Sequence, residues 1–287
     1  MIIFMKSPTS INNLENSSPK SLFQRDLIAL HGFYSDEILN LVGKNIDQLL
    51  PNYIAWQEAL ITMARNLKVD SSNPSGIPNI IEQATYNKVK SKFSIERPKK
   101  IVLGMAGPGA VGKETIQRAL GYDKVINTTT RPKRDYENTQ YRFIDSKKFN
   151  EIRAENGFII STDRLNRGQY GIQKQDIENV LLRSRIILVE ENPVNLTSLE
   201  NYIKNHGGYE FVLIYILPPS PILPHLAARL AGRVGNDFQS TITSTLGTRQ
   251  LNEFNSVSDS ITKGLDIIFL VNDKVERVVK KIKNLVE

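Results

Sequence analysis

Apolar residues recur at helical intervals through the first third of the chain. The pattern is clear between Ser21 and Leu67, and an apolar residue at every third or fourth position is typical of a helix with one buried face. Ser35 precedes two acidic residues and is therefore a predicted helix start. Pro51 is expected to end that helix, with another following it, and a further helix is predicted over residues 80–93.

After residue 99, short apolar runs typical of buried strands alternate with helical stretches. This alternation predicts an α/β fold, with a parallel sheet covered by helices on both faces. The predicted strands span 101–106, 123–127, 158–162, 185–190, 211–217 and 266–271. The predicted helices span 112–120, 146–156, 173–183, 195–205, 221–232, 238–256 and 273–285. We therefore expect an N-terminal helical segment over residues 1–95 and an α/β domain over residues 99–287.

One stretch of the α/β domain carries a specific chemistry. Residues 107–113, GPGAVGK, fit the spacing G-x-x-x-x-G-K and lie between a predicted strand and a predicted helix, which is the context of a phosphate-binding loop. Its glycines allow several N–H groups to face one anion, and the helix start adds partial positive charge. The position after the lysine usually holds a magnesium-binding Ser or Thr, but here it holds an acidic residue. The predicted ATP-binding residues are Gly107, Gly109, Val111, Gly112, Lys113, Glu114 and Thr115.

The composition excludes several classes of protein. The chain has no cysteine, which excludes disulfides, zinc–thiolate sites and thiol catalysis, and we expect a cytoplasmic protein. No apolar run approaches the ~20 residues that a membrane helix needs, so no membrane span is expected. The net charge of +7 suits phosphorylated substrates. Because the basic residues are dispersed, nucleic acid is not an expected partner.

A second group of anion-binding residues follows the loop. Arg131 and Arg134 come after a predicted strand, and Tyr141 and Tyr170 follow them. Guanidinium groups bind phosphate through two parallel hydrogen bonds, and tyrosine hydroxyls can donate to the same oxygens. These residues suit a second phosphate, separate from the one at the loop. The alternative interpretation is a solvated basic surface.

Together with motifs further along the chain, these residues resemble the guanylate kinase family of nucleoside monophosphate kinases. The resemblance covers residues 99–287 and rests on GPGAVGK (107–113), TTRPKR (129–134), Tyr170-Gly171, ILPPS (216–220), RLAGR (229–233) and LVND (270–273). It implies a core sheet, an inserted monophosphate-binding region over 128–172 and a lid over 230–248. The activity that it implies is transfer of the terminal phosphoryl group of ATP to GMP, with Mg²⁺.

The resemblance also implies roles for individual residues. Lys113 would hold the phosphates of ATP, and Arg233 and Arg249 would neutralise charge on the transferring group. Thr115 and Glu190 would bind the magnesium ion. The residues that would bind the acceptor nucleotide are Asn127, Arg131, Arg134, Tyr141, Tyr170 and Glu190.

The positions that would read the base depart from the family pattern. Ile160 stands where the family has a base-reading glutamate, and Ile172 stands where a Ser or Thr usually follows Tyr-Gly. Leu188 and Glu190 replace the family's acidic pair. An apolar side chain cannot accept hydrogen bonds from the N–H groups of guanine. The sequence thus keeps the phosphate-binding residues and changes the base-reading ones.

Three functions fit this pattern. The first is a kinase acting on GMP or on another phosphorylated acceptor, such as ribose 1,5-bisphosphate, which some relatives phosphorylate and which has no base. The second is a non-catalytic interaction module like the guanylate-kinase-like domains of scaffold proteins, although these typically lose the loop lysine, which is present here. The third is a kinase that is regulated through a protein partner of the N-terminal helices.

Overall fold

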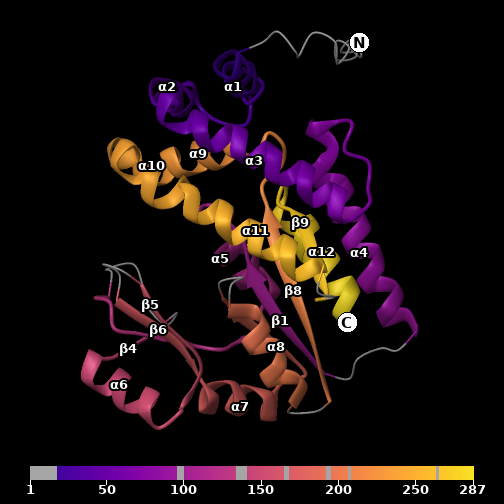
Figure 1. Ribbon diagram of the computed structural model, residues 1–287, viewed down its shortest axis with the longest axis vertical. Helices are drawn as coiled ribbons and strands as arrows, with labels where there is room; N and C mark the ends of the chain where they lie inside the picture. Colours follow the sequence, from indigo (N-terminus) through magenta and orange to yellow (C-terminus); the bar gives the residue numbers. More distant parts are fainter. Residues whose placement is uncertain are drawn as a thin grey trace.

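Four N-terminal helices precede two sheets with their flanking helices (Figure 1). The structure, a computed structural model, describes residues 18–95, 100–133, 141–164, 168–191, 195–205, 208–262 and 265–287. The N-terminal helices are α1 (Pro19–Ile28), α2 (Asp36–Lys44), α3 (Ile46–Asn66) and α4 (Ile77–Ile95). The later helices are α5 (Lys113–Leu120), α6 (Ser146–Ala154), α7 (Lys174–Arg183), α8 (Leu196–Asn205), α9 (Ile222–Val234), α10 (Phe238–Leu246), α11 (Thr248–Thr262) and α12 (Val275–Val286).

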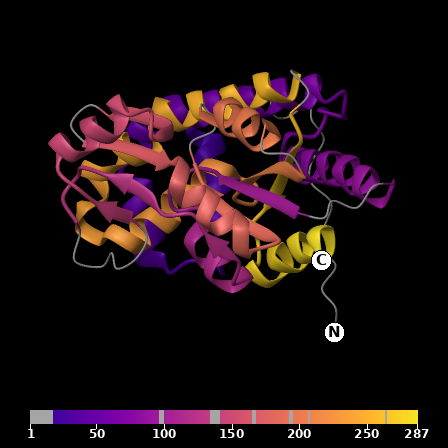
Figure 2. The same ribbon diagram turned by 90° about the horizontal axis from the view of Figure 1, so that it is seen from below.

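A five-stranded parallel sheet forms the centre of the molecule. Across the sheet its strands are β2 (Asp123–Lys124), β7 (Ile186–Glu190), β1 (Lys100–Ala106), β8 (Tyr209–Leu217) and β9 (Ile267–Val271). Every residue of β9 is buried, and so is every residue of β1 after the first. Such burial requires cover on both faces, and the view from below shows helices on either side of the strands (Figure 2). The predicted α/β fold with a parallel sheet is therefore confirmed.

A second, mixed sheet lies at one end of the molecule. Its four strands are, in spatial order, β4 (Tyr141–Phe143), β3 (Asn127–Thr129), β6 (Gly168–Gln173) and β5 (Phe158–Arg164). The predicted strand over 123–127 is therefore two short strands in different sheets. β6 escaped prediction because its glycines break the strand pattern. A Cβ at Gly171 would lie 2.7 Å from the ring of Phe158, so this position needs glycine.

Two helix boundaries that the sequence predicted are wrong. Pro51 does not end a helix but lies inside α3, and the chain turns earlier, at Asn45. The side-chain amide of Asn45 donates to the carbonyl oxygen of Leu41 and helps to close α2. One backbone hydrogen bond is lost at Pro51, and the large buried face of α3 offsets that loss. The helix predicted over 238–256 is two helices, divided at Gly247.

The N-terminal helices share their core with the helices that follow β8. Trp56 of α3 packs against Phe254 of α11, with ring centroids 5.1 Å apart. Phe238, Ile242 and Leu246 form a buried face on α10, and α10 contacts α3. One hydrophobic cluster includes residues from both parts of the chain. The segment expected as a lid, 230–248, therefore contains a helix whose apolar side packs in the core.

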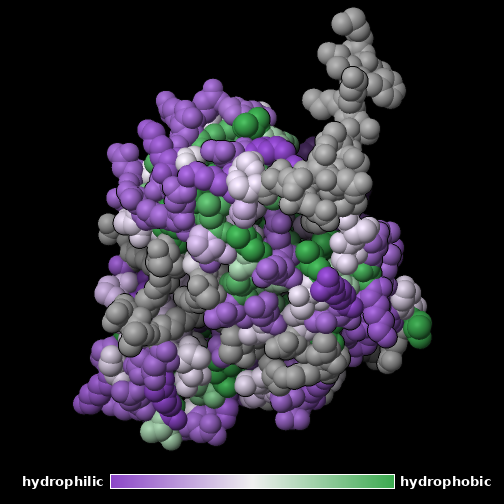
Figure 3. Space-filling model, turned by 45° about the horizontal axis from the view of Figure 1, so that its top comes forward, coloured by the Kyte–Doolittle hydropathy of each residue, from purple (hydrophilic) through white to green (hydrophobic). Residues whose placement is uncertain are grey.

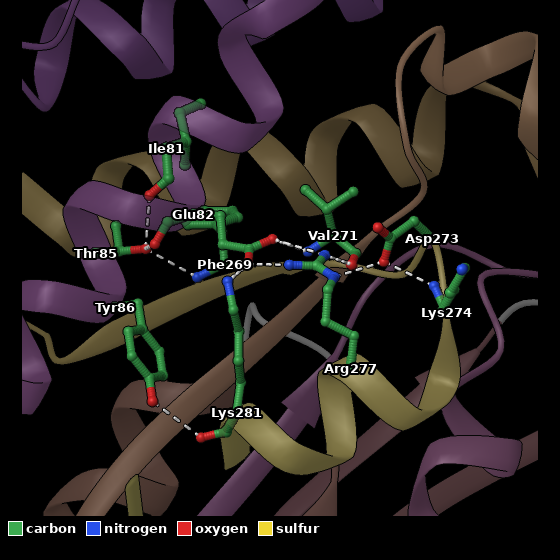
Figure 4. A network of polar contacts seen from close by, with 10 residues as sticks. All are labelled: Ile81, Glu82, Thr85, Tyr86, Phe269, Val271, Asp273, Lys274, Arg277 and Lys281. Carbon is green, nitrogen blue, oxygen red and sulfur yellow. Dashed lines mark hydrogen bonds and ion pairs between the residues drawn. The ribbon is translucent and has the colours of Figure 1, made fainter. Parts of the chain in front are cut away.

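Helix α4 covers the outer edge of the parallel sheet (Figure 4). The Thr85 hydroxyl accepts from the Phe269 amide at 3.1 Å, and the Glu82 carboxylate accepts from the Val271 amide at 2.7 Å. Glu82 also pairs with Arg277, 2.7 Å away, and with Lys281, both from α12. These contacts satisfy two amides of an edge strand that would otherwise be open to another strand.

A buried histidine ties the loop after α1 to α9. His225 is 4% exposed, and its Nδ1 lies 3.1 Å from the hydroxyl of Tyr34. Phe33 packs edge-on against the same ring, with centroids 5.8 Å apart. Burial, together with the nearby positive charge of Arg229, lowers the pKa of His225 to about 4. The imidazole is therefore neutral at physiological pH.

Several large apolar side chains of the N-terminal helical segment are exposed. Ile28, Phe33 and Ile54 are large apolar residues that are exposed in this segment. On the face drawn in Figure 3, hydrophobic side chains lie in small groups among hydrophilic ones. None of the helices in the described ranges has the length and apolar composition needed to cross a bilayer. A protein partner, and the division of the chain into residues 1–95 and 99–287, stay predictions.

Replacing Glu82 should destabilise the fold. Glu82→Ala removes the acceptor of the Val271 amide and leaves Arg277 and Lys281 without their buried partner. We expect urea unfolding to show a loss of about 3 kcal/mol, the lower end for breaking a buried ion pair. Glu58→Ala, at an exposed position of α3, is the matched control and should change stability by less than about 0.5 kcal/mol. A loss at Glu82 no larger than in the control would contradict this role.

Stability should fall as the pH falls from 7 to 5, in part because of His225. The unfolded imidazole titrates near its ordinary 6.5, whereas the folded one titrates near 4, so the unfolded state binds more protons in this range. The expected contribution is about 2 kcal/mol between pH 7 and pH 5. Urea unfolding of the wild type and of His225→Gln at both pH values measures it. Equal pH dependence of the two proteins would refute it.

Candidate active site

The predicted phosphate loop connects β1 to α5 in a conformation that requires glycine at two points. Gly107 has φ of 142°, and a Cβ there would lie 2.5 Å from the carbonyl oxygen of Ile216. Gly112 has φ of 95°, and a Cβ there would lie 2.7 Å from the side-chain nitrogen of Asn272. Both glycines therefore let the loop lie directly against neighbouring strand ends. The loop opens at the carboxyl ends of the parallel strands, where α/β folds bind ligands.

Two side chains fix the middle of the loop through one backbone carbonyl. Arg229 of α9 donates to the Val111 carbonyl oxygen at 3.0 Å, and Asn272 donates to the same oxygen at 2.7 Å. Arg229 also donates to the carbonyl oxygen of Asn272 at 2.8 Å. Val111 itself is fully buried. The loop is therefore held in place by two side chains from other parts of the chain.

Lys113 folds back over the loop. Its Nζ donates to the carbonyl oxygens of Gly107 at 2.8 Å and Pro108 at 3.0 Å. Burial lowers the pKa of Lys113, and the acidic groups Glu190, Glu253 and Glu114 oppose that shift. An ammonium group held at a glycine-rich loop is suited to bind the terminal phosphates of a nucleotide.

Glu190, at the end of β7, lies next to this loop. Its Oε2 accepts from Lys124 and from Gln117, each at 3.0 Å. Burial would raise the pKa of Glu190, but the charges of Lys124 and Lys113 and these hydrogen bonds outweigh it, so the pKa lies below its ordinary value. The carboxylate is therefore ionised at neutral pH. Asn127, one of the predicted acceptor-binding residues, donates to the backbone carbonyl oxygen of Glu190 at 2.9 Å. This hydrogen bond connects β3 to the end of β7.

Three of the predicted acceptor-binding residues lie together on the second sheet. The guanidinium group of Arg131 lies over the rings of Tyr141 and Phe143, at 4.9 and 5.3 Å from their centroids. Tyr170 packs edge-on against Tyr141, with centroids 6.3 Å apart. The aromatic rings hold the guanidinium in one place, as cation–π contacts do. The cluster therefore presents a fixed positive group with phenol groups beside it.

The positions expected to read a base are apolar and buried. Ile160 and Ile172 face each other across the β5–β6 pair, and they are 6% and 0% exposed. Asp163, which lies nearby in the sequence, forms a two-point ion pair with Arg153 at 2.9 and 3.2 Å. Hydrogen bonds from Arg153 and Gln169 lower the pKa of Asp163. Neither isoleucine can supply the acceptor that a guanine ring would need.

The remaining predicted site residues are less closely grouped. Glu114 and Thr115 are exposed in the first turn of α5, and Arg233 is exposed in the last turn of α9. Arg134 lies outside the described residues, and so does the side chain of Arg249. The candidate site in the described ranges therefore consists of the loop, Glu190 with its partners, and the Arg131 cluster.

The donors present suit a magnesium ion shared with a nucleotide. Among the described residues, no group of three or more acidic or histidine side chains is placed to hold a metal on its own. Magnesium is usually bound through one or two side-chain oxygens together with substrate phosphates. The exposed hydroxyl of Thr115 and the carboxylate of Glu190 could provide these oxygens.

The sequence analysis missed several residues that contribute to this geometry. Lys124 and Gln117 bind Glu190, while Arg229 and Asn272 were noted only as parts of motifs. For Asn272 the signal was its place directly after a buried strand end. For Lys124, which lies near the start of the predicted strand over 123–127, nothing local indicates its partner.

The α/β part of the chain is similar to known guanylate kinases. The model of the family described as guanylate kinase matches residues 97–287. The guanylate kinase of Syntrophomonas wolfei is 29% identical over 197 residues, which are 66% of this chain and 92% of the relative. That of Zymomonas mobilis is 29% identical over 188 residues, or 63% and 80% of the two chains. The solved guanylate kinase from Anaplasma phagocytophilum aligns with a TM-score of 0.46 at 19% identity, covering 66% of this chain and 85% of that one.

The resemblance seen in the motifs is therefore confirmed. The family match includes the phosphate loop, the Arg131 cluster and the strand that ends at Glu190, whereas residues 1–96 lie outside it. Since the match covers more than half of the chain, this protein belongs to the guanylate kinase family.

Proposed function

We propose that this protein transfers the terminal phosphoryl group of ATP to the phosphate of a nucleoside monophosphate, with GMP as the first acceptor to test. The observation that carries the proposal is the intact phosphate loop with Lys113 folded over it, at the edge of the sheet that also bears Glu190. The Arg131 cluster is the counterpart on the acceptor side. A non-catalytic module would have no need of this lysine.

In the proposed reaction, an oxygen of the acceptor phosphate attacks the terminal phosphorus of ATP. The bond from that phosphorus to the bridging oxygen breaks, ADP leaves with the bridging oxygen, and the acceptor becomes a diphosphate. Such a transfer needs alignment and positive charge around the moving group and little covalent work by the protein. Lys113 would hold the donor phosphates, and Arg131 with Tyr141 and Tyr170 would hold the acceptor phosphate.

A magnesium ion would neutralise charge on the phosphates of the donor. Thr115 and Glu190 are the residues that would hold it, and the ionised state of Glu190 suits that role. The carboxylate of Glu114 lies exposed beside the loop and adds negative charge there. At an effective dielectric constant near 20, a like-charge contact at ~4 Å costs on the order of 4 kcal/mol, which a cation at the site would offset.

A second acceptor class is favoured by the buried pair Ile160 and Ile172. A base that is read by hydrogen bonds needs polar partners, and a site without them discriminates poorly between bases. An acceptor without a base, such as ribose 1,5-bisphosphate, would require only the phosphate-binding cluster.

A panel of acceptors tests the function. ADP release with ATP and magnesium is measured for GMP, dGMP, AMP, CMP, UMP and ribose 1,5-bisphosphate, with wild-type protein and Lys113→Ala. We expect turnover with at least one acceptor and a loss of more than about 100-fold in Lys113→Ala, because the loop lysine stabilises charge in the transition state. Thermal unfolding of both proteins checks that the fold is kept. No turnover together with no ATP binding would identify an interaction module instead.

Replacing Arg131 should weaken binding of the acceptor and leave binding of ATP unchanged. Arg131→Ala removes a charge-assisted contact worth about 1.5–3 kcal/mol, so the KM for the acceptor should rise at least about tenfold. The KM for ATP should stay within about twofold. Arg142→Ala is the matched control, since Arg142 lies on the same sheet but is ion-paired with Asp176 at 2.6 Å. A change confined to the KM for ATP would refute the assignment.

A further inference from the structure

Lys124 is the last residue of β2. Like the phosphate loop, it lies at the carboxyl end of the parallel sheet. β2 pairs with β7 in parallel, and β7 pairs with β1, so the three strands place Lys124, Glu190 and the loop at neighbouring carboxyl ends. Lys124 precedes Asn127 and Arg131 of the acceptor side by only a few residues. The lysine therefore lies near the donor loop, and only a short stretch of chain separates it from the acceptor side.

Two polar partners hold the Lys124 ammonium at this point. Its Nζ donates to Glu190 Oε2 at 3.0 Å and to Gln117 Oε1 at 2.8 Å, while Gln117 donates in turn to Glu190. The side chains of Lys124 and Glu190 are 27% and 25% exposed. An ion pair buried purely for stability would be closed to solvent, whereas this one is partly exposed. The third N–H of the ammonium is not used by these two contacts.

The part of the chain that was expected to close over the site carries few cations. Between Arg233 and Arg249 the sequence contains no lysine and no arginine. Helix α10 in particular reads FQSTITSTL. Phosphoryl transfer needs positive charge around the moving group, and α10 supplies none of it.

We propose that Lys124 is a catalytic residue of this site, whose ammonium group contacts the transferring phosphoryl group alongside Lys113. Glu190 and Gln117 hold it at the strand end, and the phosphate oxygen occupies its remaining N–H. This proposal rests on the proposed kinase function. It adds a second lysine to the phosphate site, supplied by β2 and not by the loop.

The comparison of a terminal-phosphate ligand with ADP tests this contact without turnover. The probes are a non-hydrolysable ATP analogue and ADP, titrated by calorimetry with magnesium into wild-type protein and Lys124→Met. We expect the analogue to bind about tenfold more weakly to the variant, because one charge-assisted hydrogen bond is lost. ADP, which lacks the terminal phosphate, should lose less than about threefold. In turnover, kcat should fall by about 100-fold with the acceptor KM unchanged.

Lys100→Met is the matched control. Lys100 is the first residue of β1 and lies at the amino end of the same sheet. There it donates to the Tyr209 hydroxyl at 2.9 Å. The Lys100→Met variant loses the same charge as Lys124→Met, and it should bind both ligands as the wild type does. Thermal unfolding of each variant checks folding. If Lys124→Met bound the analogue and ADP with the same loss, or with none, the proposal would be wrong.

A second pair of variants separates phosphate contact from mere neutralisation of Glu190. If Lys124 only balances the carboxylate, Lys124→Met should have no effect on analogue binding in a Glu190→Gln background. If it contacts the phosphate, the tenfold loss should persist there. If the wild type bound the analogue but turned over none of the acceptors, the proposed transfer to these acceptors would be rejected. The binding comparison would still decide the role of Lys124.

Discussion

The carbonyl oxygen of Val111 fixes the phosphate loop, because it receives hydrogen bonds from Arg229 and from Asn272 at once. These donors come from different elements, the helix after β8 and the end of β9. A loop that has to present several N–H groups to an anion works best when it is already in its binding conformation. The positive φ angles of Gly107 and Gly112 allow this conformation, and the two donors maintain it.

This constraint connects the N-terminal helices to the loop. Glu82 of α4 accepts from the amide of Val271, the residue directly before Asn272. The edge of the sheet that carries Asn272 is thus held by a helix outside the family match. The N-terminal segment therefore has a structural role whatever partner it binds, because it completes the sheet on which the loop is mounted. A family domain without this helix would need another way to cover the same edge.

The predictable parts of the molecule were those encoded by neighbouring residues. The phosphate loop could be recognised because strand, glycines, lysine and helix start follow one another in the sequence. The short strand β6 could not be recognised, since the ring of Phe158 requires glycine at position 171. Pro51 was misread because the tertiary burial of α3 outweighs its local cost. The contact between Lys124 and Glu190 joins residues 66 positions apart, and no local sequence pattern predicts it. Long-range pairs of this kind decide the electrostatics of the site.

Helix α10 is packed into the core and has no basic residue, which limits what its movement could contribute to the site. Phe238, Ile242 and Leu246 hold α10 in the core, and α10 carries no cation of its own. A closing movement of α10 would therefore have to carry part of that core with it or expose it, and would bring little positive charge to the phosphates. Cations that are fixed at strand ends carry no such cost, because the sheet places them before any ligand arrives. The described residues of α10 thus serve packing, while Lys113 and Lys124 lie beside strand ends of the parallel sheet.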